Sequence, residues 1–119
     1  MRVLVPGTFD MLSPKQLFRL SKVREAYPDS VIIACILDLA TYEETMGPVL
    51  NKHDEIKNSL EHCKYIDTVL EESPAQISTA FVKRHNIDIV VNVEESPAFI
   101  DFLKGAYELR VVKEMNSEV

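Results

Sequence analysis

The residues with the clearest potential for chemistry lie in the stretch Gly7–Gln16, which reads Gly-Thr-Phe-Asp-Met-Leu-Ser-Pro-Lys-Gln. This stretch follows the short apolar run Val3–Val5 and leads directly into a helical pattern. A strand, a glycine-containing turn and the start of a helix present free backbone N–H groups and the positive end of a helix dipole. Because that arrangement suits a phosphate group, the sequence predicts an anion-binding turn here.

The end of the same stretch also has an ordinary structural interpretation. Ser13 is a good N-cap residue, Pro14 suits the first helical position, and Gln16 would complete a Ser-x-x-Gln capping box. Lys15 then has two interpretations. It holds an anion together with the first amides of the helix, or it is a solvated lysine on a capped helix. We favour the solvated lysine.

The rest of the chain alternates strand-like and helix-like segments. Leu17, Leu20 and Val23 form an apolar stripe at helical spacing that ends before Pro28, and Val31–Leu37 is a continuous apolar run typical of a strand buried on both faces. The other expected elements are a strand at Arg2–Val5, a loop at 41–52, a helix through Ile56, Leu60 and Cys63, a short segment at Tyr65–Leu70, a helix at Gln76–His85, a strand at Asp88–Val93, a helix at Pro97–Lys104 and a last strand at Glu108–Val112.

This order of elements predicts an α/β protein. Successive parallel strands need right-handed crossovers, so we expect a single Rossmann-like open parallel sheet flanked by helices. The domain is expected to span residues 1–113, and a polar tail follows at 114–119. In such sheets a ligand lies beyond the carboxyl ends of the strands, at the topological switch point. The first strand ends at Pro6-Gly7-Thr8, so position alone also indicates the Gly7 turn.

The composition excludes several classes of function. The 119 residues carry a formal charge of −6, whereas a nucleic-acid surface needs clustered lysine and arginine, so we expect no nucleic-acid partner. A nucleotide-sized ligand needs only a local positive site. No apolar run approaches the length of about 18 residues that a membrane helix needs, and the N-terminus shows no signal peptide. We therefore expect a cytoplasmic protein without a transmembrane segment.

The cysteines and histidines indicate no metal site. Cys35 and Cys63 have no second cysteine at metal-ligand spacing, so we expect two reduced, buried thiols. The three histidines, His53, His62 and His85, are scattered over separate elements and are expected to be surface or core residues.

Three segments together resemble one known family. Gly7-Thr8-Phe9-Asp10 resembles the opening motif of the nucleotidyltransferase family of choline-phosphate, ethanolamine-phosphate and glycerol-phosphate cytidylyltransferases. The segment His62–Val69 is similar to that family's His-Cys-Arg-Tyr-Val-Asp-Glu-Val, and Ser73–Val90 is similar to a later run of the family. The resemblance extends from Arg2 to about Glu94 and is closest to the choline- and ethanolamine-phosphate branch. It implies the nucleotidyltransferase type of fold, with CTP and Mg²⁺ used if the chain is active and no tightly bound cofactor.

The positions that contact phosphate in the family are substituted in this chain. The two histidines of the His-x-Gly-His motif fall on Ser13 and Gln16, and the motif glycine falls on Lys15. A phosphate-binding lysine falls near Met46, and the arginine of a Glu-Arg motif falls on Ile56. The family's closing motif, Arg-Thr-x-Gly-Ile-Ser-Thr, has no counterpart. Losing one pre-organised donor typically lowers a rate by about 10²–10³, so no catalytic residue can be assigned here with confidence.

The remaining nucleotide-binding candidates are Lys15, the turn residues Gly7, Thr8 and Phe9, and the acids Asp10, Asp38 and Glu94. Asp10 either recognises an acceptor ammonium, as the resemblance implies, or orients its own turn, which we favour. Asp38 matches a family aspartate near the nucleotide, and it reads equally well as a loop cap. The acids at Asp38 and Glu94 would repel a triphosphate that has no matching cations.

Paired glutamates recur along the chain and are expected on solvated faces. The pairs are Glu43-Glu44, Glu71-Glu72 and Glu94-Glu95.

The resemblance and the substitutions together predict a catalytically impaired or inactive relative of the phospholipid-pathway cytidylyltransferases, acting as a binding or partner subunit. Two alternatives stay open. The chain is an active cytidylyltransferase with an altered site, in which Lys15 and Mg²⁺ replace the lost cations, or it binds another phosphorylated small molecule. The family commonly forms dimers, and the resemblance places Tyr65 and Asp67 near the interface. We therefore expect a homodimer or a heterodimer with an active homologue.

Overall fold

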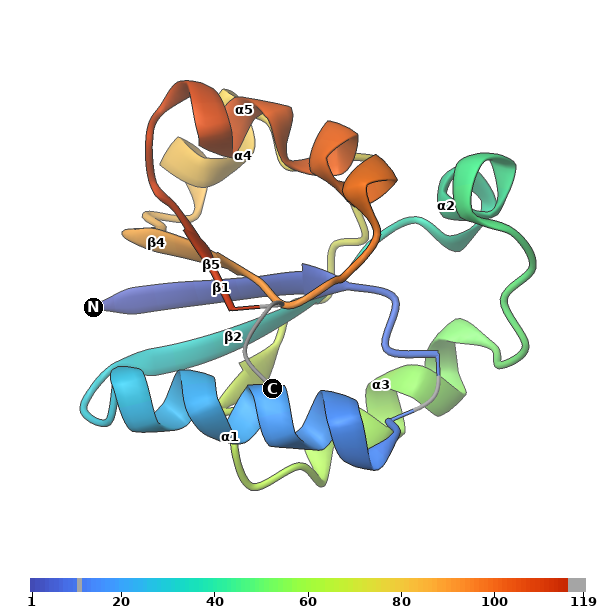
Figure 1. Ribbon diagram of the computed structural model, residues 1–119, viewed down its shortest axis with the longest axis horizontal. Coiled ribbons are helices and arrows are strands. Elements are labelled where there is room, and N and C mark those ends of the chain that lie inside the picture. Colours follow the sequence, from blue (N-terminus) through green and yellow to red (C-terminus); the bar gives the residue numbers. More distant parts are fainter. Residues whose placement is uncertain (11, 116–119) are drawn as a thin grey trace.

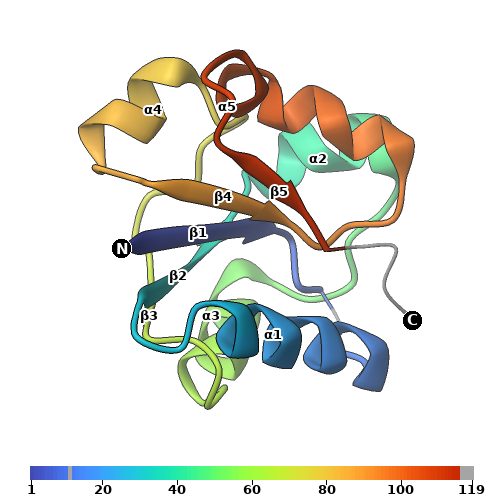
Figure 2. The same cartoon turned by 60° about the vertical axis from the view of Figure 1, so that its left-hand side comes forward.

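Parallel strands form the centre of the molecule (Figures 1 and 2). The computed structural model describes residues 1–10 and 12–115. The described residues form one sheet in the order β3-β2-β1-β4-β5, with every neighbouring pair parallel. The strands are β1 (Arg2–Gly7), β2 (Val31–Ile36), β3 (Thr68–Val69), β4 (Ile89–Asn92) and β5 (Val112–Glu114). The predicted open parallel sheet is confirmed.

Helices cover both faces of this sheet. The helices are α1 (Pro14–Ala26), α2 (Leu39–Met46), α3 (His53–Glu61), α4 (Thr79–Arg84), the 3₁₀ helix η1 (Pro97–Leu103) and α5 (Lys104–Glu108). Figure 1 shows α1 and α3 on one face and α4 and α5 on the other, with α2 beyond the ends of the strands. No helix within residues 1–10 and 12–115 is long and apolar enough to cross a membrane.

The strands supply two cores because their side chains alternate between the faces. Val3 and Val5 of β1 pack beneath α1 and α3, whereas Leu4 packs toward α4, η1 and α5. The same alternation runs through β2, where Ile32, Ala34 and Ile36 face the first core and Ile33 and Cys35 face the second. This double burial explains why Val31–Leu37 reads as a continuous apolar run.

Several expected elements differ from the structure. The loop expected at 41–52 begins with α2, which Asp38 caps through the N–H of Thr41 and which ends at Gly47, where φ is 100°. Only glycine adopts that backbone conformation without strain. Ser78 caps α4, so this helix begins at Thr79 rather than at Gln76.

The C-terminal part is shifted relative to the prediction. The segment Pro97–Lys104 is mostly 3₁₀, and α5 continues to Glu108. The last strand was expected at Glu108–Val112, but a turn at Arg110, with φ of 59°, delays it to Val112–Glu114. Glu114 therefore belongs to a strand, although we expected it in the polar tail. The other tail residues beyond Met115 lie outside the described residues.

Candidate functional site

The sheet reverses its winding between β1 and β4. The helix that follows β1 packs on one face, and the helices that follow β4 pack on the other (Figure 2). The carboxyl ends of these two neighbouring strands therefore form the topological switch point, where ligands bind in sheets of this type. The Gly7 turn and the residues after β4 meet at this edge, as the sequence predicts.

The Gly7 turn is closely covered by neighbouring side chains. Thr8 and Phe9 are buried, and Phe9 adopts a φ of 52°, which is uncommon for a residue with a side chain. A Cβ atom placed on Gly7 would lie 3.3 Å from Oε2 of Glu94 and 3.4 Å from the ring of Phe9. A larger residue at position 7 would therefore crowd the Glu94 side chain, and the carboxylate of Glu94 lies directly against the turn that we expected to hold an anion.

The start of α1 confirms part of the predicted cap. Ser13 is the N-cap, its hydroxyl accepts a hydrogen bond from the N–H of Gln16, and Pro14 occupies the first turn. The reciprocal half of the capping box is wrong. The Gln16 side chain donates from Nε2 to Oε2 of Glu94 at 3.3 Å instead of returning to Ser13. Gln16 contacts Glu94 instead because the loop after β4 passes in front of the start of α1.

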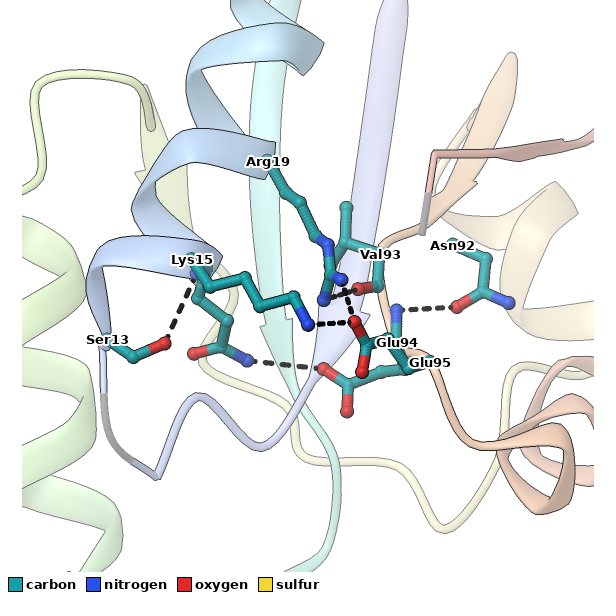
Figure 3. Close-up of polar contacts among 8 residues, drawn as sticks. Ser13, Lys15, Arg19, Asn92, Val93, Glu94 and Glu95 are labelled. Carbon is teal, nitrogen blue, oxygen red and sulfur yellow. Dashed lines mark hydrogen bonds and ion pairs between the residues drawn. The ribbon is translucent and has the colours of Figure 1, made fainter. Parts of the chain in front are cut away.

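Basic side chains of α1 reach the same loop (Figure 3). Nζ of Lys15 lies 2.5 Å from Oε1 of Glu95, and the lysine side chain is 54% exposed. It is a surface lysine on a capped helix that also makes an ion pair. Arg19, one helical turn further on, makes an ion pair with the same oxygen and donates from Nη1 to the carbonyl of Val93 at 3.3 Å. Two cations of α1 therefore converge on one carboxylate of the β4–η1 connection.

Glu94 corrects our expectation that the Glu94-Glu95 pair is a solvated face. Burial raises the pKa of the Glu94 carboxyl above its ordinary value, and the neighbouring Glu95 adds to the increase, while Gln16 and Arg19 oppose it. Glu95, by contrast, is exposed, and its contacts with Lys15 and Arg19 lower its pKa. The edge therefore combines a partly buried carboxyl with an exposed, ion-paired one.

Tyr42 of α2 also borders this edge. Burial is the main cause that raises its pKa, Glu94 and Asp10 contribute further, and a hydrogen bond with Thr8 opposes them. The phenol is thus close to Thr8 of the Gly7 turn.

The other two acids have structural partners. We expected Asp10 to orient its own turn, but its carboxylate accepts hydrogen bonds from the N–H groups of Leu50 and Asn51, at 2.8 and 2.7 Å. It therefore anchors a loop that is distant in sequence. Asp38 is the N-cap of α2, since its carboxylate accepts from both the N–H and the hydroxyl of Thr41. The interpretation of Asp38 as a cap is confirmed.

The positions matched to the family's lysine and arginine lie in apolar surroundings. Met46, the last residue of α2, packs against the core beneath α4 and α5. Ile56 of α3 is 2% exposed and belongs to the opposite core. Neither side chain supplies charge to the edge of β1 and β4.

Histidines and cysteines stay away from this site. His53 is hydrogen-bonded to Ser73 and His85 to Glu72, and the ring of His62 contacts a backbone carbonyl of its own helix. Among the described residues, no three histidine, cysteine or acidic side chains are placed to hold a metal ion. Cys35 is buried, and burial raises the pKa of its thiol to about 12, whereas Cys63 is only partly buried.

The segment matched to the family's dimer interface makes contacts within its own chain. The carboxylate of Asp67 accepts from the N–H of Ile32 and from Arg24, at 2.7 and 2.6 Å, and these contacts lower its pKa. Tyr65 is half-buried, and Lys64 lies over its ring.

Arg19 and Glu95 are the site residues that sequence reasoning missed. Arg19 lies within the apolar stripe of α1, and its side chain is only 6% exposed. An arginine four residues after a lysine on one helix face is a usable signal, because positions i and i+4 are neighbours. The partner that makes these residues a site lies in a loop far along the chain, and no local pattern connects the two.

Comparisons with known proteins agree with this architecture. A family model described as cytidylyltransferase-like matches residues 4–119, and the chain belongs to this family. A probable choline-phosphate cytidylyltransferase of Schizosaccharomyces pombe is 28% identical over 91 residues, which are 76% of this chain and 25% of that protein. Choline-phosphate cytidylyltransferase 2 of Arabidopsis thaliana is 27% identical over 92 residues, 76% of this chain and 30% of that protein. The chain thus spans less than a third of the length of these relatives.

A solved structure shows the same fold. The lipopolysaccharide core biosynthesis protein of Thermoplasma volcanium superposes with a TM-score of 0.73 at 12% identity, covering 100% of this chain and 98% of that one.

Proposed function

We propose that this cytidylyltransferase-like chain binds a cytidine nucleotide, or another phosphorylated small molecule, at the edge of β1 and β4 without efficient cytidylyl transfer. Its role would then be that of a binding or partner subunit related to the choline- and ethanolamine-phosphate branch. The observation that carries the proposal is the carboxylate of Glu94 against Gly7, at the turn where a transferase of this type needs donors.

The chemistry explains why this observation matters. Cytidylyl transfer brings an anionic acceptor phosphate onto the α-phosphate of CTP while pyrophosphate leaves, so the protein must mainly position the groups and stabilise negative charge. At the family's motif positions this chain offers a capping hydroxyl at Ser13 and an amide at Gln16, and Gln16 already contacts Glu94. When it is ionised, the Glu94 carboxyl beside the turn opposes the negative charge that develops in the transition state.

Magnesium would supply charge neutralisation on a bound triphosphate. The described residues offer no cluster of acidic side chains for such an ion, and Asp10 and Asp38 are occupied by backbone N–H groups. Mg²⁺ in nucleotide sites is commonly held through the substrate phosphates with few protein carboxylates. The ion would therefore enter with the nucleotide.

Calorimetry and a turnover assay test the proposal together. Titration with CTP, CDP-choline and CDP-ethanolamine should detect binding of at least one of them, and pyrophosphate release with phosphocholine or phosphoethanolamine should stay far below ordinary enzyme rates. Turnover at ordinary enzyme rates would overturn the claim of impaired catalysis. If no nucleotide binds, a thermal-shift screen of sugar phosphates decides the second ligand class, because a ligand at 100 times its Kd adds about 2.7 kcal/mol of stability.

A further inference from the structure

Lys15 and Arg19 share one acceptor at the switch-point edge. Both reach Oε1 of Glu95 from successive turns of α1 (Figure 3). The Glu95 side chain is half exposed, so it can turn outward into water without burying its charge. The two cations are thus held by a group that is free to leave.

Arg19 has more donors than the loop can satisfy. Its side chain is more than nine-tenths buried, Nη1 reaches the carbonyl of Val93 and Nη2 reaches Glu95, but Nε has no hydrogen-bond partner among the described residues. Buried polar atoms are normally paired, so unpaired ones need an explanation such as a missing ligand.

We propose that Glu95 occupies the place of a ligand phosphate, and that a pyrophosphate or nucleotide phosphate group binds to Lys15 and Arg19 by displacing this carboxylate. The inference rests on the proposed function and deepens it, because it names the residues that would hold the phosphate. The site lies beside α1 rather than at Gly7, where Glu94 excludes an anion.

A phosphate group fits these donors better than the carboxylate does. The planar guanidinium presents several N–H groups that match phosphate oxygens, and charge-assisted hydrogen bonds of this type are strong. Phosphate carries more oxygens and more charge than one carboxylate, so separate oxygens can bind Nη2 of Arg19 and Nζ of Lys15, which now share Oε1 of Glu95.

The first experiment titrates inorganic pyrophosphate and CTP by calorimetry into the full chain. Glu95→Gln removes the competing charge, so we expect binding to tighten by about tenfold or more. Adding Lys15→Gln to Glu95→Gln should reverse that gain. Glu72→Gln is the matched control, because Glu72 is similarly exposed and also lies between two basic side chains, Arg84 and His85. It should leave the affinity unchanged.

The second experiment observes Arg19 directly. In proton–nitrogen correlation spectra the Nε–H signal that disappears in Arg19→Lys belongs to Arg19, and it should shift when pyrophosphate is added to the wild-type chain or to Glu95→Gln. If the contact of Glu95 with Lys15 and Arg19 only stabilises the fold, adding pyrophosphate will not shift this signal. If CTP binds but Glu95→Gln behaves like Glu72→Gln and the Arg19 signal does not move, the inference is wrong while the proposed function stands. If neither CTP nor pyrophosphate binds any variant, the inference is wrong, and the proposed function then depends on the sugar-phosphate screen alone.

Discussion

At the scale of single residues, carboxylates determine which groups are available at the carboxyl ends of β1 and β4. Glu94 lies against Gly7, Glu95 takes the two cations of α1, and Asp10 holds the backbone at 50–51. Each acid has a different environment, and therefore each has a different measurable consequence.

Glu94 should make stability depend on pH. Burial raises its pKa above the ordinary 4.5, so the folded state keeps this proton in a range where the unfolded chain has lost it. The stability that this proton contributes is fully present below 4.5 and declines as pH rises through the folded pKa. The groups that face Glu94 include Gln16, Arg19, Glu95 and the phenol of Tyr42.

The test compares the free energy of unfolding of the wild type and Glu94→Gln in urea between pH 4 and pH 7. The difference between the two proteins should shift in favour of Glu94→Gln as pH rises. Glu25→Gln, at an exposed position of α1, serves as the control. A difference that stays constant over this range would contradict the buried-carboxyl interpretation.

Asp10 should act on stability through the loop that it anchors. Asp10→Ala removes the acceptor of two backbone N–H groups, and we expect the free energy of unfolding to fall by about 2 kcal/mol. Urea denaturation measures this loss, with Asp29→Ala at an exposed site as the control. Equal stabilities of the two variants would show that the anchor contributes little.

At the scale of elements, α4 and α5 pack with their backbones in close approach. A Cβ atom on Gly105 of α5 would lie 2.3 Å from the backbone nitrogen of Thr79 and 2.4 Å from the carbonyl carbon of Ser78. Real atoms do not approach this closely, so any larger residue must push the two helices apart. This contact closes the core on the face opposite α1.

Gly105→Ala should therefore lower the free energy of unfolding by about 3 kcal/mol or more, because overpacking against backbone cannot be relieved by a side-chain rotation. Thermal or urea unfolding provides the measurement. Lys104→Ala is the matched control, since Lys104 is the exposed neighbour on the same helix. A loss below 1 kcal/mol would mean that α5 can shift away from α4 freely.

At the scale of the whole molecule, the family resemblance leads us to expect self-association. We predict a two-fold homodimer, or a heterodimer with an active relative, built partly on Tyr65. Asp67 is a poor probe because it holds Arg24 and the N–H of Ile32 within the chain, whereas Tyr65 is half-buried at the surface. Tyr65→Glu should place a charge in the interface and dissociate the dimer at micromolar concentration.

Sedimentation or light scattering measures this outcome, with circular dichroism to confirm that the variant is folded. Lys64→Glu is a useful companion change at the exposed neighbouring position. A wild-type monomer, or a dimer that tolerates Tyr65→Glu, would assign the segment to folding alone.

The fold of this protein could be predicted from its sequence because the controlling patterns are local. The apolar run of β2 reflects burial on both faces, and the Ser13-Pro14 start of α1 depends on neighbours within one turn. The ligand edge at Gly7 follows from the order of the elements. The ends of the elements were less predictable. The turn at Arg110 and the helix at Leu39–Met46 depend on capping contacts and packing, which the weak structural propensities of single residues do not specify.

Only the tertiary structure decided which side chains contact one another at the site. Gln16 and Glu94 are 78 residues apart in sequence, and Arg19 and Glu95 are 76 apart, so no spacing rule links them. Parallel pairing of β1 with β4 brings the loop after β4 over the start of α1. That packing desolvates one carboxyl and pairs the other, because burial and charge at each acid depend on which distant backbone lies beside it. The sequence determined where the edge lies, and the fold determined what occupies it.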